Sequence, residues 1–122
     1  MNHDERTYAN IGACFDVYNQ MGCGFLEAVY QECLEIELGL RDIPFIPQKQ
    51  LNLYYKEREL NQKYVPDFIC FDHVIVELKA ISDLDTEHHA QLLNCLKGSR
   101  LQTGLLVNSG HYPKLEYKRM VL

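Results

Sequence analysis

The stretch that most constrains the fold of this chain covers residues 64–80, where two short apolar, β-prone runs flank the polar pair Asp72-His73. This pattern predicts two antiparallel strands joined by a tight turn. Glu77 and Lys79 are two residues apart, so on a strand they point to the same face. The residues that alternate with them point to the other face and can enter a core: Val74, Val76 and Leu78. Because an acid and a base on a largely apolar strand are costly to bury without partners or a metal, this stretch is the first indication of chemistry.

Asp67 lies on the first of these two strands, and its relation to Glu77 depends on the strand register. In one register Asp67 is opposite Glu77, and residues 71–73 form the connection. If residues 72–73 alone form the turn, Asp67 faces Leu78 and points away from Glu77, because a shift of one residue reverses every side chain. A functional interpretation therefore predicts the three-residue connection, or a bulge that restores the same parity.

The length and composition describe one ordinary globular domain. At 122 residues, with 47% apolar and 24% charged residues, we expect residues 1–122 to form a single domain. No apolar run approaches the roughly 20 residues that span a membrane, and the polar N-terminus lacks a signal-peptide core. We therefore expect a cytoplasmic protein with no membrane partner. The five cysteines are odd in number and include no C-x-x-C pair, which favours free thiols over a zinc or iron–sulfur site.

The charges are distributed unevenly along the chain. The net charge of −5 is not typical of a nucleic-acid-binding protein. However, residues 1–45 hold 8 acids and 2 bases, whereas residues 46–122 hold 9 acids and 10 bases. Two interpretations stay open for the second part, a local basic surface and scattered solvated charge. The candidates for such a surface are Lys49, Lys56, Arg58, Lys63, Lys97 and Arg100.

The periodicity of apolar residues predicts the order of the elements. We expect helices over residues 5–20 and 25–38, with Gly39 as a stop, and a connector over residues 41–47. A strand follows over residues 48–59, then the central hairpin, and then a helix that runs to about Lys97. The last predicted elements are a buried central strand at 103–108 and an edge strand at 115–122. This order predicts an α/β or α+β sheet with helices packed on it.

Three polar residues on the predicted helices have both an ordinary and a functional interpretation. Glu27 and Tyr30 are three residues apart and share a helix face. The helix dipole favours an acid near the N-terminus, which is the ordinary explanation of Glu27, and Tyr30 is ordinarily an interfacial aromatic residue. Gln91 is a polar residue in the middle of an otherwise apolar stretch.

Four pieces of the sequence together resemble a known family. Pro66-Asp67 and Glu77-Leu78-Lys79, on adjacent strands followed by a helix, resemble the PD-(D/E)XK nuclease superfamily. The run Gly24-Phe-Leu-Glu27-Ala-Val-Tyr30 is similar to the motif of its GxxExxY family, and the runs at 91–96 and 104–108 also look like that family. Cys95 departs from the pattern, because an aromatic residue is more common there.

The resemblance implies a restriction-endonuclease-like core, in which a mixed β-sheet is flanked by helices and carries the active site at one end. It implies that Asp67, Glu77 and Glu27 are ligands of Mg²⁺ or Mn²⁺. It further implies that Lys79 positions the attacking water or stabilises charge on the phosphate. Gln91 would have an orienting role in the site from the later helix, and Tyr30 would support Glu27. The implied substrate is a nucleic acid, with DNA favoured, and a homodimer is expected where both strands are cut.

These assignments agree with the chemistry of phosphodiester hydrolysis, because a hard cation held by carboxylates polarises the phosphate and lowers the pKa of its bound water. Two other classes of function stay open at this point. The chain can be a module that keeps the nuclease fold and binds nucleic acid or a protein without cutting. It can also be a scaffold in which Lys79 forms an ion pair with Glu77 or Asp67 and no metal binds.

Overall fold

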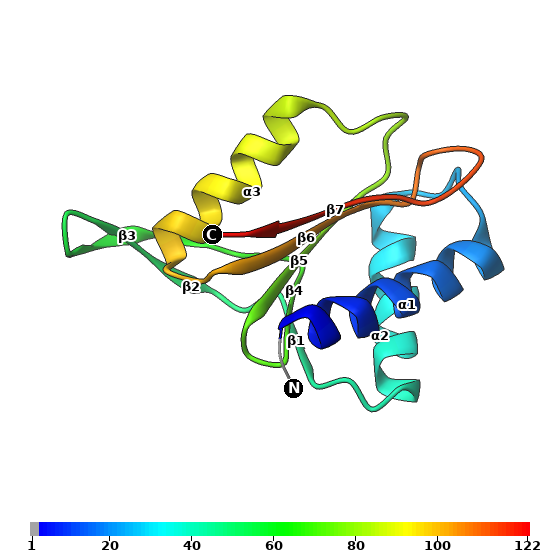
Figure 1. Cartoon of the computed structure of the whole chain (residues 1–122), viewed down its shortest axis with the longest axis horizontal. Coiled ribbons are helices and arrows are strands. Elements are labelled where there is room, and N and C mark those ends of the chain that lie inside the picture. Colours follow the sequence, from blue (N-terminus) through cyan, green and yellow to red (C-terminus); the bar gives the residue numbers. More distant parts are fainter. Residues whose placement is uncertain (1–2) are drawn as a thin grey trace.

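The computed structural model describes residues 3–122, so the first two residues of the predicted domain lie outside the described residues (Figure 1). The elements follow in the order α1 His3–Met21, α2 Glu27–Leu40, β1 Phe45–Pro47, β2 Leu51–Tyr55, β3 Arg58–Tyr64, β4 Phe68–Cys70, β5 Val74–Lys79, α3 Thr86–Ser99, β6 Thr103–Asn108 and β7 Glu116–Val121.

A five-stranded sheet in the order β1-β4-β5-β6-β7 forms the centre of the molecule. The β5–β6 pair is parallel and the other pairs are antiparallel, so the sheet is mixed. Helices α1 and α2 cover one face and α3 covers the other (Figure 1). The predicted class, a mixed sheet flanked by helices, is therefore confirmed. None of the helices in the described residues has the length and apolar character needed to cross a membrane.

The apolar core follows the alternation of residues along the central strands. Val74, Val76 and Leu78 join the cluster under α1 and α2, as the sequence predicts. Ile75, on the opposite face of the same strand, packs with Leu92, Leu96 and Leu106 under α3. Every residue of β6 is buried, which agrees with its predicted central position. Strand β7 lies at the edge of the sheet, also as predicted.

The register of the central hairpin is the one that a functional interpretation requires. Strands β4 and β5 pair Phe68 with Val76 and Cys70 with Val74, so residues 71–73 form the connection. The N–H of His73 donates to the carbonyl oxygen of Cys70 at 3.1 Å and closes this turn. Continuing the same register by one residue places Asp67 opposite Glu77.

The structure corrects the predicted elements between the first helices and the central hairpin. The predicted strand over 48–59 is two strands, β2 and β3, which form a separate hairpin. The turn is at Lys56 and Glu57, whose φ angles are 46° and 69°. Neither residue is a glycine or asparagine, so the usual signal of such a turn is absent from the sequence. The predicted connector contains the short edge strand β1, which ends at Pro47, where an edge position tolerates the missing N–H.

The helix ends also differ from the prediction by a few residues. Helix α2 continues through Gly39 to Leu40, and the N–H of Arg41 still bonds the carbonyl oxygen of Glu37. Helix α3 begins after an Asp85 N-cap, and its Ser99 end lies two residues beyond the predicted end. All five cysteines are free, as predicted.

Candidate active site

Two hydrogen bonds hold Asp67 against Glu77 and Leu78 where the β4–β5 pairing ends. The backbone N–H of Asp67 donates to Oε1 of Glu77 at 2.9 Å, and the N–H of Leu78 donates to Oδ2 of Asp67 at 2.7 Å. Each carboxylate thus accepts from the backbone of the opposite strand and keeps its other oxygen for a further partner. The predicted proximity of Asp67 and Glu77 is therefore present.

A cavity of about 370 Å³ lies beside this pair, between the sheet and α3. Glu77 and Lys79 line it from β5, because both point to the face that α3 covers. Gln91 lines it from α3, so three of the predicted site residues meet in one cavity. Four other polar or reactive residues line it, of which the sequence singled out only the last, as a departure from the family pattern: Tyr64, His88, Asn94 and Cys95.

Burial raises the pKa of the three acids of this region, and the charge of Asp67 adds to the shifts of Glu77 and Glu27. Burial, and next the charge of Asp67, raise the pKa of the Glu77 carboxyl to about 7, although the Asp67 N–H, Tyr64 and Lys79 oppose the shift. Burial also raises the pKa of Asp67, against the Leu78 N–H and Lys79. Partial desolvation and the charge of Asp67 raise the pKa of the largely exposed Glu27, again against Lys79. The three acids and Lys79 are therefore close enough for their charges to interact.

Lys79 is close enough to act on these carboxylates without being tied to one of them. Its charge lowers the pKa of Asp67, Glu77 and Glu27. No ion pair within 4.0 Å joins it to any acid of residues 5–122. The ion-paired scaffold considered from the sequence therefore has no support from the geometry.

Asp67 and Glu77 fit a hard divalent cation. Each offers a carboxylate oxygen that accepts no backbone hydrogen bond, and burial raises the pKa of both carboxyls, which disfavours their charged forms until a cation binds. Oxygen ligands of this kind suit Mg²⁺ and Mn²⁺, which need few protein ligands. Glu27 is exposed, and the charge of Asp67 raises its pKa. Among the described residues, it does not form a three-ligand group with ligand atoms within 4.8 Å.

The segment from Gly24 to Tyr30 has a structural explanation. Gly24 has a φ of +110°, a conformation that other residues rarely adopt, and it leads into α2, whose first residue is Glu27. The buried Tyr30 hydroxyl donates to the Gly22 carbonyl oxygen at 2.6 Å and accepts from the Phe25 N–H at 3.2 Å. Tyr30 thus closes the loop that leads into the start of α2.

Two further residues, which sequence reasoning missed, contact the Asp67–Glu77 pair. The side chain of Gln31 donates to the carbonyl oxygen of Asp67 at 3.3 Å, which links α2 to the start of β4. The Tyr64 hydroxyl is buried with no partner of good hydrogen-bond geometry. Burial and the neighbouring Glu77 raise the pKa of Tyr64. The sequence predicts residue 64 at the start of the central hairpin, whereas the structure places it at the end of β3, so this contact was not predicted.

A second group of possible metal ligands, Asp83, His111 and Glu116, has ligand atoms within 4.8 Å of one another. The hydrogen bonds of Glu116, a member of this group, connect parts of the fold. Oε1 of Glu116 accepts from the Leu84 N–H at 2.9 Å and from the Asn108 amide at 3.0 Å. These contacts join the loop after β5 to the start of β7 at the same end of the sheet as Lys79.

Comparison with known proteins agrees with this fold and geometry. A family model described as the PD-(D/E)XK nuclease superfamily matches residues 4–120. Because the match spans most of the sequence, this chain belongs to the PD-(D/E)XK nuclease superfamily. Membership supports a nuclease-like function that depends on a divalent metal and acts on nucleic acid.

A solved structure, "Crystal structure of SSO0001", superposes with a TM-score of 0.61 and 14% sequence identity. The superposition covers 77% of this chain and 50% of that chain, so this chain spans about half the length of that protein. At this identity the likeness concerns the fold alone, and the fold is consistent with a restriction-endonuclease-like core. No curated protein matches the sequence.

Proposed function

We propose that this protein is a Mg²⁺- or Mn²⁺-dependent nuclease of the GxxExxY family that hydrolyses phosphodiester bonds, with DNA as the preferred substrate. The observation that carries the proposal is the pair of Asp67 and Glu77, which the Asp67 N–H joins, with Glu77 and Lys79 side by side on the wall of the cavity. The proposal treats residues 1–122 as one nuclease domain in the cytoplasm, with a homodimer where two strands are cut.

The residues of the site divide the chemistry among them. Asp67 and Glu77 would hold the cation through their free oxygens, with Glu27 as a further ligand or water partner from α2. When bound, such a cation polarises the phosphate and lowers the pKa of a bound water. The Lys79 ammonium group orients the attacking water or stabilises the charge that develops on the phosphate. Gln91 orients a group in the cavity from the side of α3.

The alternative is a module that binds nucleic acid or a protein and does not cut. The acidic net charge of −5 motivates above all its protein-binding form, because a net negative charge disfavours a polyanionic partner. Such a module would bind DNA with an affinity that falls as salt rises, and would leave the DNA intact. The unpaired Lys79 favours the nuclease, since a binding surface needs no free ammonium group beside two carboxylates.

A cleavage panel tests the nuclease proposal. Purified protein is incubated with Mg²⁺ or Mn²⁺ and with linear, circular, branched and single-stranded DNA or with RNA. Asp67→Asn and Lys79→Ala are each expected to lower the cleavage rate about a hundredfold or more. Matched controls are Glu32→Gln and Lys118→Ala, which change exposed residues outside the site and should cut like wild type.

A titration with Mn²⁺ measures metal binding independently of cleavage. Calorimetry should show one binding event in wild type that Asp67→Asn weakens, because a ligand oxygen is lost. Cleavage that is equal in wild type and both site variants would refute the assignment and point to a contaminating nuclease. Metal binding without cleavage of any substrate would favour the binding module.

A further inference from the structure

The β2–β3 hairpin projects from the rest of the molecule next to the end of α3 (Figure 1). Gly98 of α3 packs so closely under the hairpin that an added Cβ would lie 3.0 Å from Cδ2 of Leu53. The Arg100 guanidinium group, just after α3, lies 3.9 Å from the centre of the Tyr54 ring. Residues 49–64 and 97–100 therefore form one unit, which we call the basic arm.

The basic arm carries a charge opposite to that of the rest of the chain. It holds six of the 12 basic residues and two of the 17 acidic residues. The arm thus has a net charge of +4, whereas the remainder has a net charge of −9. Its basic residues are Lys49, Lys56, Arg58, Lys63, Lys97 and Arg100, and all six are exposed. The local basic surface that the sequence left open is therefore present as a surface of one projecting unit.

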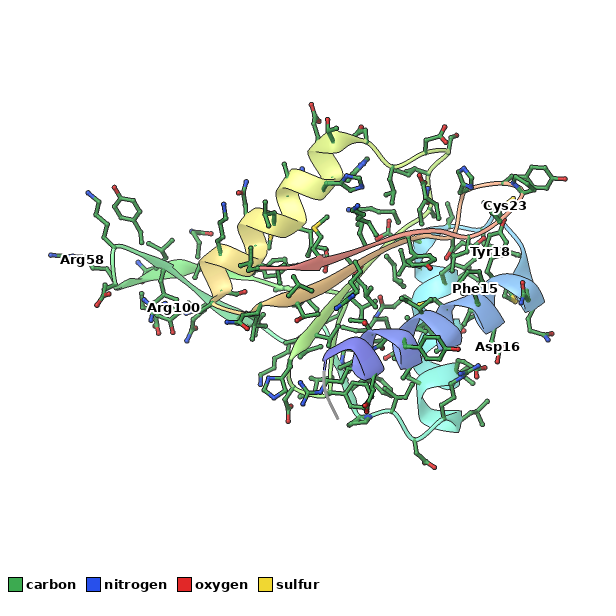
Figure 2. All side chains as sticks on the ribbon, in the orientation of Figure 1. Phe15, Asp16, Tyr18, Cys23, Arg58 and Arg100 are labelled. Carbon is green, nitrogen blue, oxygen red and sulfur yellow. The ribbon has the colours of Figure 1, made fainter. Side chains whose placement is uncertain are left out.

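Most cations of the basic arm lack an acidic partner. Lys63 lies 3.7 Å from Glu59, and no ion pair joins the other five to any acid of residues 5–122. By contrast, Arg41 on the main body is paired with both Asp16 and Glu37. Figure 2 shows Arg58 at the far tip of the hairpin and Arg100 near its base. Positive charge that faces solvent along this whole length is complementary to a polyanion.

We propose that the basic arm binds the sugar-phosphate backbone of a double-helical nucleic acid and directs it to the active-site cavity. This inference rests on the proposed nuclease function. Strand β3 leads from the arm to the site, because its last residue, Tyr64, lines the cavity beside Glu77. Asp67 follows three residues later. A duplex held along the arm is therefore continuous with the place where the phosphate is cut.

The shape of the basic arm favours a duplex over a single strand. A two-stranded ribbon fits a major groove that is roughly 12 Å wide. The seven residues of β3 extend over about 20 Å, which corresponds to about six base pairs. Single-strand binding needs a row of exposed aromatic rings for stacking. In the arm Tyr55 is 61% exposed, whereas Tyr54 is covered by Arg100 and Tyr64 lines the cavity.

The test measures binding to a fluorescent 20-base-pair duplex by anisotropy, in EDTA so that no cation supports cleavage. The arm variant is Lys56→Gln/Arg58→Gln. The matched control is Lys114→Gln/Lys118→Gln, which removes the same charge from exposed positions outside the arm. At 0.1 M salt the arm variant should bind about 60-fold more weakly, with a log–log salt slope shallower by about 1.8. The control should stay within about twofold of wild type.

Equal losses of affinity in the arm variant and in the control would overturn the inference. So would binding of the single strand as tight as that of the duplex, or no binding of wild type to either. The proposed nuclease function is judged separately, by cleavage in Mg²⁺. Binding that depends on the arm, without cleavage by wild type, would refute the nuclease and support the arm. Cleavage that Asp67→Asn abolishes, with unchanged binding in the arm variant, would do the reverse.

Discussion

Replacing Glu77 with glutamine should stabilise the metal-free protein at pH 8. In the folded state, burial and the charge of Asp67 raise the pKa of the Glu77 carboxyl from 4.5 to about 7. At pH 8 the folded protein therefore holds a carboxylate that its surroundings disfavour. Glutamine keeps the shape and the oxygen that accepts from the Asp67 N–H, but it carries no charge.

The size of the effect follows from the shift in pKa. Each pKa unit corresponds to about 1.4 kcal/mol, so a shift from 4.5 to about 7 corresponds to about 3 kcal/mol. The folded protein binds the Glu77 proton more tightly than the unfolded chain does. The stability that this group provides is therefore complete below pH 4.5 and is lost as the pH rises to about 7. Glu77→Gln should add about 3 kcal/mol at pH 8 and almost nothing at pH 4.5.

Urea unfolding in EDTA at pH 5 and at pH 8 measures this difference, and adding Mn²⁺ should reverse its sign because the variant lacks a ligand. Glu116→Gln is the control of opposite sign. Burial opposes the shift of the Glu116 pKa, but hydrogen bonds from Asn108 and Leu84 and the nearby histidines lower it overall. Its charge therefore stabilises the fold above pH 4.5, and Glu116→Gln should weaken the fold at pH 8. A Glu77→Gln variant less stable than wild type at pH 8 in EDTA would refute the electrostatic account of the site.

Three further predictions concern the framework around the site. Burial raises the pKa of the Cys14 and Cys70 thiols to about 12, so a thiol reagent at pH 8 should modify them only after denaturation, as peptide mass mapping would show. Gly110→Ala should lower the free energy of unfolding by about 1–3 kcal/mol, since the new Cβ would lie 2.5 Å from backbone atoms of Ile81; unchanged stability would contradict that contact. Leu105→Ala should cost about 2–5 kcal/mol in urea unfolding, because Leu105 is fully buried under α1 and α2.

The central hairpin shows which features of the structure can be predicted from the sequence. The alternation along residues 74–79 predicts which side chains enter the core and that Glu77 and Lys79 share the other face. The structure confirms both and shows that the second face lies against α3. Requiring Asp67 opposite Glu77 selects one of two registers, and that register is observed. The prediction succeeds because side chains on a strand alternate with a strict period of two, so one pairing determines all the others.

The hairpin of β2 and β3 shows where sequence reasoning fails. Its turn uses Lys56 and Glu57 at positive φ, and six of the seven residues of β3 are exposed, so neither turn residues nor an apolar face marks the strand. The sequence therefore did not predict that Tyr64 would line the active-site cavity. It also left open whether six basic residues gather, because Lys97 and Arg100 are far from the hairpin in the sequence.

By itself the sequence determined the fold class, the central hairpin that carries Asp67 and Glu77, and the face that Glu77 shares with Lys79. These features depend on the local period of strands and helices, which a short segment carries within itself. Only the tertiary structure decided that Gln91 lines the same cavity as Glu77 and Lys79, and that Glu27 lies near enough to Asp67 for its pKa to be raised. It also decided that six exposed basic residues lie together on the basic arm. These contacts join elements that are distant in the chain, and packing of the whole core sets their relative positions.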